Sequence, residues 1–224
     1  MKNQPLYILI VENGVKLPFS DELTVVQQWI SQNLPFTATF EKLTANVPIS
    51  YETVFWNGMK SYSVAYSTRK AISSLVPYND YNIIIHVHKP EEINGVNFFS
   101  GQTFQDQRYA GAVLIDLCIE STWDEGDTLQ NVTHELMHAM WTMLKWSNII
   151  PASQYFLYDT MDSYFKDDQV WAPDGNRAQN LARLAPYFQI LAKQMQDPFL
   201  KRLLQQVIDL ATKLLPWVKR SQSL

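Results

Sequence analysis

The first half of the chain alternates short apolar runs with polar turns, a pattern typical of strands mixed with helices. Four apolar or alternating segments predict strands, and they span residues 6–11, 36–44, 81–88 and 109–119. Residues 21–32 follow Ser20 and open with two acidic residues, which predicts the start of a helix. We therefore expect a sheet with helices between its strands.

A longer amphipathic segment follows the last predicted strand. It begins at Asp127 or Thr128, either of which is a candidate N-cap, and it contains no Gly or Pro through residue 148. Its apolar residues recur at steps of three and four, at Leu129, Val132, Leu136, Met140 and Met143. That spacing predicts a helix with one side facing the core.

The pattern changes beyond Pro151. Periodic apolar segments over 178–196 and 198–217 predict helices, and the region contains no clear strand. The sequence therefore predicts an α+β protein in two parts. A β/α lobe with a mixed sheet spans residues 1–150, and an all-helical lobe spans residues 151–224.

The long amphipathic helix carries His134, Glu135 and His138 in the pattern HExxH. Side chains four residues apart lie on one face of a helix, so both imidazoles can reach one metal ion, with Glu135 beside them. This is the spacing of a zinc hydrolase, in which the Glu accepts a proton from the attacking water. The alternative is a helix whose two histidines serve packing alone.

A strand at 109–119 that leads through a short polar loop into an HExxH helix resembles the zincin metallopeptidases, loosely over residues 6–168. The resemblance implies a peptidase with one zinc per chain. It also implies an edge strand above the zinc that holds an extended peptide by main-chain hydrogen bonds. The metzincin form, HExxHxxGxxH, does not fit, because Trp141 and Leu144 stand where it has the Gly and the last His.

A zinc of this kind takes three protein ligands, so a third one is needed. No His follows His138 and no Glu follows Glu135, which excludes the gluzincin ligand by residue type and leaves Asp. Asp162 is the first candidate, because it lies nearer than Asp159 to the apolar side of the predicted helix. Residues 160–164 are also similar to the aspzincin pattern GTxDxxYG, without either Gly and with the Tyr one place early. The other Asp would hydrogen-bond a ligand imidazole, unless both are solvated surface carboxylates.

The resemblance also implies the mechanism. Zinc would lower the pKa of its bound water and polarise the scissile carbonyl, while Glu135 would pass the proton to the leaving amine. Zincins use a further donor from the C-terminal half for the oxyanion. Tyr164 ranks first for this role, with a core aromatic as the alternative. The other candidates are Tyr155, Tyr158, Arg177 and Tyr187.

His86 and His88 form a second histidine pair within the predicted strand at 81–88. Alternation along a strand places both side chains on one face, where they could bind a metal of their own. The alternative is a structural role, or a position near the substrate cleft. An interior strand of a zincin-type sheet favours this alternative.

Composition narrows the classes of function. A net charge of -4 with scattered basic residues argues against a nucleic-acid surface. The apolar run near the N-terminus is too short for a signal peptide, and no segment reaches the length of a membrane span. Cys118 is the only cysteine, which suits a small buried hydrophobe in a reducing compartment. We expect a cytoplasmic enzyme with a peptide or protein substrate and no nucleic-acid or membrane partner.

Two other classes of function fit the same residues. A zincin-type fold without activity would act as a binding or scaffold protein, although such a protein would not need Glu135. A zinc hydrolase of non-peptide amides, or of peptidoglycan stem peptides, would keep the whole motif.

Overall fold

A five-stranded sheet organises the residues that the computed structural model describes, which are 4–33, 36–56, 58–90 and 97–146. Its strands are β1 (Gln4–Asn13), β2 (Phe36–Ala45), β5 (Ile83–His88), β7 (Gly101–Tyr109) and β8 (Ala112–Cys118). Their spatial order is β2-β1-β5-β8-β7. The strands β2, β1, β5 and β8 run parallel to one another, and β7 runs antiparallel to β8. The sheet is therefore mixed, as predicted, and β7 is an edge strand.

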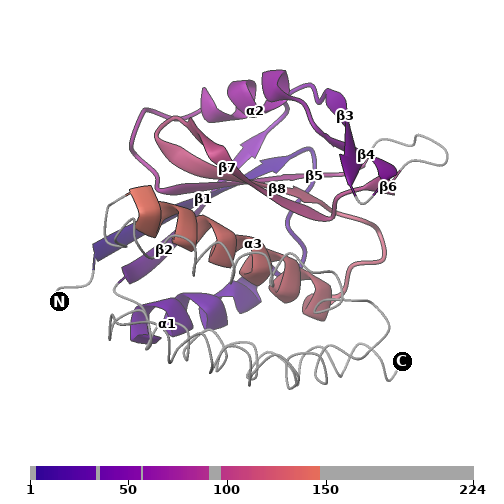
Figure 1. Cartoon of the computed structure of the whole chain (residues 1–224). Coiled ribbons are helices and arrows are strands. Elements are labelled where there is room, and N and C mark those ends of the chain that lie inside the picture. The colour runs from indigo at the N-terminus through magenta and orange to yellow at the C-terminus, as the bar shows by residue number, and fades with distance from the viewer. Residues whose placement is uncertain (1–3, 34–35, 57, 91–96, 147–224) are drawn as a thin grey trace.

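Helices cover both faces of this sheet (Figure 1). On one face lie α1 (Leu23–Asn33), which follows the single-turn helix η1 (Ser20–Glu22), and α3 (Glu125–Trp146). The shorter α2 (Tyr66–Ser73) lies on the other face. Because both faces are covered, β5 and β8 are buried along their whole length, which explains why their sequences are mostly continuous apolar runs.

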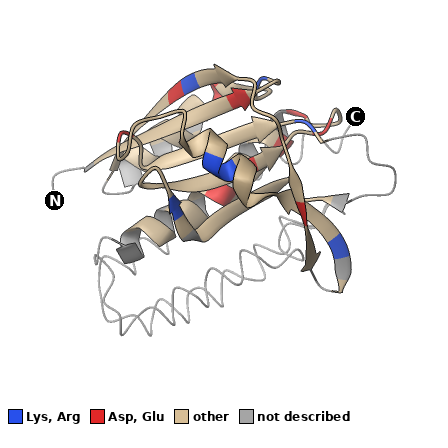
Figure 2. Ribbon diagram, turned by 90° about the horizontal axis from the view of Figure 1, so that it is seen from above, with Lys and Arg blue, Asp and Glu red and all other residues tan. Residues whose placement is uncertain are grey.

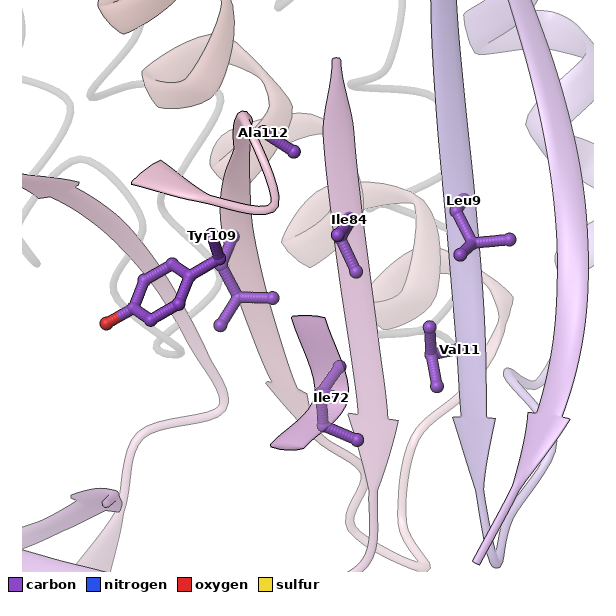
Figure 3. Packing of buried hydrophobic residues seen from close by; sticks show 7 residues of the cluster. Leu9, Val11, Ile72, Ile84, Tyr109 and Ala112 are labelled. Carbon is purple, nitrogen blue, oxygen red and sulfur yellow. The ribbon is translucent and has the colours of Figure 1, made fainter. Parts of the chain in front are cut away.

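The face under α2 packs around a cluster of buried aliphatic residues (Figure 3). Ile72 of α2 lies over Ile84 of β5, and Leu9 and Val11 of β1 lie beside them. Leu114 of β8 belongs to the same cluster. Each fully buried aliphatic side chain of this kind contributes about 1.5–3 kcal/mol to folding. Since side chains two residues apart share a face of a strand, this cluster defines which positions of β1, β5 and β8 face α2.

A smaller sheet stands beside the main one, in the order β3-β4-β6. It consists of the hairpin β3 (Tyr51–Trp56) and β4 (Met59–Val64) with the short strand β6 (Asn97–Phe98). Buried Arg69 of α2 joins the two sheets. Its guanidinium donates to Glu52 of β3 at 2.8 Å and to the carbonyl of Val64 in β4. It also donates to the hydroxyl of Tyr109 in β7, at 2.9 Å.

The strands predicted at 6–11, 36–44 and 81–88 are confirmed as β1, β2 and β5, and the helix predicted at 21–32 as η1 and α1. The segment 109–119 is not one strand. Tyr109 ends β7, the next two residues turn the chain with positive φ, and β8 begins at Ala112. The hydrophobic pattern does not predict β3, β4, β6, β7 or α2. In β3 and α2 many positions are exposed and polar, so no apolar run or clean alternation marks them.

The helix α3 begins earlier than predicted. Asp124 Oδ1 accepts a hydrogen bond from the Asp127 N–H at 2.9 Å, and Asp127 Oδ2 accepts one from the Asp124 N–H at 3.0 Å. This reciprocal pair is a capping box that opens at Asp124, so the prediction of Asp127 or Thr128 as the N-cap is wrong. Val132 and Leu136 of the predicted apolar stripe are fully buried, as expected.

The predicted helical lobe at 151–224, with its helices at 178–196 and 198–217, lies outside the described residues. The division of the chain near residue 150 therefore stays a prediction. In the part of the chain that the structure describes, no helix combines the length and the apolar character of a membrane span. Charged residues of both signs are scattered over the described ribbon, and they form no continuous basic stripe there (Figure 2).

Candidate metal centre and a second histidine cluster

The HExxH motif lies in the middle of α3, on a helix that packs against β7 and β8. Glu135 precedes Leu136 and His138 precedes Ala139, and both of these apolar residues are fully buried. Glu135 and His138 therefore lie at the edge of the helix face that packs on the sheet. Glu135 is 5% exposed and His138 is 3% exposed, while His134 is half-buried. The motif therefore lies in a covered position, where electrostatic interactions are stronger than in water.

The imidazoles of His134 and His138, here called the helix pair, lie in contact with each other. Their Nε2 atoms are 3.0 Å apart, and their ring planes meet at 84°. At this distance the Nε2–H of one ring can donate a hydrogen bond to Nε2 of the other. Two nitrogens on a tetrahedral zinc, each about 2.0–2.1 Å from it, lie about 3.3 Å apart. The spacing of the helix pair is therefore that of a hydrogen bond, and it is also close to that of two zinc ligands.

Glu135 lies over two residues of the edge strand. Thr103 Oγ1 donates a hydrogen bond to Glu135 Oε2 and lies 3.1 Å from the Glu135 carbonyl oxygen. Gly101, on the same face of β7, leaves the space that the carboxylate occupies, because a Cβ there would lie 2.9 Å from Oε1. Glu135 Oε1 lies 3.9 Å from His134 Nε2. The carboxylate thus packs against β7, with Oε2 bound by Thr103 and Oε1 between Gly101 and His134.

The remaining predicted site residues lie outside the described residues. They are the ligand candidates Asp159 and Asp162, the first oxyanion candidate Tyr164, and the alternatives Tyr155, Tyr158, Arg177 and Tyr187. Their roles stay predictions. Of the predicted centre, the structure describes His134, Glu135 and His138, and it brings these three together.

A second cluster lies on the opposite face of the sheet. His86 and His88 of β5 follow Ile84 at steps of two, and Asp116 of β8 follows Leu114, so all three share the face that α2 covers. The two histidines are each 1% exposed, and Asp116 is 5% exposed. Their nitrogen and oxygen atoms lie within 4.8 Å of one another, so the group could in principle hold a metal ion.

Hydrogen bonds connect the three side chains. His86 Nδ1 lies 2.7 Å from Asp116 Oδ1, and His88 Nε2 lies 3.1 Å from Asp116 Oδ2. Burial by itself lowers the pKa of His88, but the charge and hydrogen bond of Asp116 and the bond to the Lys89 carbonyl outweigh burial and raise this pKa. Burial by itself raises the pKa of Asp116, but the charge of His88 and the bonds from both histidines hold it well below its usual range.

The sequence predicts that His86 and His88 share a face, and their stacked rings, 5.0 Å apart, confirm it. It does not predict Asp116, which joins them only because β5 pairs with β8 in a register that places His86 opposite Asp116. The available signal was one Asp inside an otherwise apolar strand. Cys118, on the same strand, is buried as predicted. Burial and nearby carboxylates raise the pKa of its thiol to about 12, so it is an inert thiol.

Comparison of the chain with protein-family models, with curated proteins and with solved structures finds no match. No family thus assigns a role to either histidine pair. Function has to be inferred from the chemistry and geometry of the sites.

Proposed function

We propose that this protein is a zinc-dependent metallopeptidase. The observation that carries the proposal is the helix pair, whose Nε2 atoms lie 3.0 Å apart with Glu135 Oε1 3.9 Å from that of His134. His134, His138 and one Asp, either Asp162 or Asp159, would hold one zinc per chain. When bound, zinc supplies an activated water and polarises the carbonyl of the scissile bond.

Glu135 is the general base in this proposal. Its Oε1 lies 3.9 Å from His134 Nε2, and it would accept a proton from the attacking water and return it to the leaving amine. Thr103 binds Oε2 and keeps the carboxylate from rotating away. Thr103 is therefore a positioning residue, because it acts through Glu135.

The edge strand β7 provides the surface for the substrate. Among the strands that the structure describes, β7 pairs with β8 on one side, so a peptide could add as a further strand on the other. Gly101 and Thr103 belong to this strand and contact Glu135. A peptide paired with β7 would therefore lie next to the general base.

We also infer a zincin-like fold from the same arrangement, an antiparallel edge strand over an HExxH helix. The edge strand in this fold is β7, which the sequence does not predict. The predicted strand at 109–119 corresponds mainly to β8, which lies inside the sheet between β5 and β7.

The variant Glu135→Gln tests the proposal. The amide keeps the size of the side chain but cannot accept the proton, so hydrolysis of a peptide library by the zinc-loaded protein should fall by roughly 10²–10⁴-fold. Zinc content and circular dichroism should match those of the parent, because Glu135 is not a ligand in this proposal. Both proteins are compared at equal metal loading.

Three outcomes would contradict the proposal in different ways. Equal peptide hydrolysis by parent and variant would mean that Glu135 is not the base. A parent that holds zinc but cleaves no substrate would favour the scaffold class. A parent that cleaves other amides or esters, and leaves peptides intact, would favour a non-peptide hydrolase.

A further inference from the structure

His86 and His88, here called the strand pair, have a different ring geometry from the helix pair. Their planes differ by only 18°, and their centroids lie 5.0 Å apart in a stacked arrangement. Each ring directs one nitrogen to its own oxygen of Asp116. The ligand atoms are close enough for a metal. Since each of these nitrogens already contacts its own carboxylate oxygen, a metal could bind only in place of those hydrogen bonds.

Asn13 determines which nitrogen of His86 carries the proton. Its Oδ1 accepts a hydrogen bond from the Val47 N–H at 2.7 Å, and its Nδ2 donates to the Val47 carbonyl at 3.0 Å. This double pairing orients the amide, so the group 3.2 Å from His86 Nε2 is a donor. His86 Nε2 must therefore accept, and its Nδ1 carries the proton that is donated to Asp116. A metal at Nδ1 would force that proton onto Nε2, where it would face another donor.

Both nitrogens of His88 face acceptors. Nδ1 lies 2.8 Å from the Lys89 carbonyl, which cannot donate, so Nδ1 carries a proton. Nε2 lies 3.1 Å from Asp116 Oδ2. The proton between them belongs to the nitrogen, because an imidazole (ordinary pKa about 6.5) is more basic than a carboxylate (about 3.9). Asp116 also accepts a second hydrogen bond from His86, which further favours its charged form.

We propose that Asn13, His86, His88 and Asp116 form a proton-binding cluster, in which His88 is an imidazolium, Asp116 a carboxylate and His86 a neutral ring protonated on Nδ1. The cluster holds a buried ion pair where β1, β5 and β8 meet at their carboxyl ends. Its hydrogen bonds are complete with the protons in place, and a metal would have to displace protons from both rings. The proposal does not depend on the peptidase function.

The cluster makes stability depend on pH. Within the described part of the chain, Tyr51 of β3, 3.5 Å from Nδ1, and Cys118, its partner in β8, also face His88. Because the pKa of His88 is raised, its stabilising effect is present below about pH 6.5 and is lost as the pH rises through the folded-state pKa. Because the pKa of Asp116 is lowered, its effect is present above about pH 3.9 and is lost as the pH falls through the folded-state pKa.

Long-range ¹H–¹⁵N NMR spectra of the imidazole rings test the protonation states, since the chain has only 4 histidines. At neutral pH, both nitrogens of His88 should have the shifts of protonated nitrogens. His86 should have a protonated Nδ1 and an unprotonated Nε2. The single variants His134→Ala and His138→Ala identify the other two rings. A neutral His88, or a His86 protonated on Nε2, would overturn the proposal.

A zinc titration of the double variant His134→Ala/His138→Ala tests whether the strand pair binds protons or a metal. With the helix pair removed, an excess of zinc should leave the ring signals of His86 and His88 unchanged. Stoichiometric zinc binding that shifts these signals and releases protons would overturn the proposal and assign a metal site there. If the double variant does not fold, the titration is made on the parent, where the signals of the strand pair should again stay unchanged.

Discussion

The helix pair and the strand pair lie on opposite faces of one sheet. Both consist of two histidines, but a helix and a strand arrange the two rings differently. On α3, a step of four residues brings the two rings together at 84°, with their Nε2 atoms 3.0 Å apart. On β5, a step of two residues leaves the rings stacked at 18°. The nitrogens of the helix pair therefore lie next to each other, while those of the strand pair bind two separate oxygens of Asp116. On this difference we base the proposal of a metal at the first pair and of protons at the second.

The carboxylates beside the two pairs differ in the same way. Glu135 has one oxygen bound by Thr103 and the other 3.9 Å from His134 Nε2, a position from which we propose that it transfers a proton. Asp116 uses both oxygens on the strand pair, which suits the neutralisation of a buried charge. The comparison teaches that a His–His–carboxylate composition does not by itself identify a metal site.

Removal of a helix-pair imidazole should have the largest effect. In our proposal His138→Ala deletes a direct ligand, so zinc affinity should fall far more than the roughly 10- to 100-fold typical of a residue that only hydrogen-bonds a ligand. Asn131→Ala, on the same helix, is the matched control and should keep one zinc per chain. Metal analysis after dialysis measures both. Full zinc retention in His138→Ala would mean that zinc binds elsewhere, and the contrast between the two pairs would fail.

The third ligand is tested by comparing two aspartates. Asp162→Ala should weaken zinc binding more than Asp159→Ala, because only Asp162 is predicted to contact the metal. The loss for Asp159→Ala should stay within about 10- to 100-fold. Competition with a chelator gives the two dissociation constants. The reverse ranking would make Asp159 the ligand and leave the helix pair in place.

The variant Thr103→Val tests the hydrogen bond by which β7 positions the Glu135 carboxylate. Thr103→Val keeps the shape of the side chain but removes the donor, and it should lower kcat by about 10- to 100-fold, the usual worth of a hydrogen bond to a charged group. KM and zinc content should change little, because neither the substrate nor the metal contacts this hydroxyl in the proposal. Thr103→Ser restores the donor and should recover most of the rate. A Val variant as active as the parent would remove Thr103 from the mechanism.

The smallest effect concerns pH and the strand pair. In the parent, the free energy of unfolding should fall as the pH rises through the folded-state pKa of His88. Asp116→Asn removes the charge that raises this pKa, so the midpoint of the His88 titration should move down by about one pH unit or more. Urea unfolding at a series of pH values, with the NMR titration of His88, measures the change. An unchanged midpoint in the variant would mean that Asp116 does not hold the proton on His88.

The sequence by itself determines the features that depend on spacing within one element. Apolar periodicity identifies β1, β2, β5 and α3, because the pitch of a helix and the alternation of a strand impose these periods directly. The HExxH spacing places His134, Glu135 and His138 together for the same reason. The shared face of His86 and His88 follows from alternation alone. All of these depend on backbone geometry over a few residues.

The tertiary structure decided which partners these residues meet. Thr103 reaches Glu135 across 32 positions of the chain, and Asn13 reaches His86 across 73. Such partners depend on the strand order β1-β5-β8-β7 and on its register, which follow from the packing of the whole sheet and leave no periodic trace in the sequence. A shift of one residue in register would turn Asp116 to the other face, and the strand pair would lose its counter-charge. The residue types thus indicate two groups able to bind metal or protons, and in our proposals the packing suits one group to zinc and the other to protons.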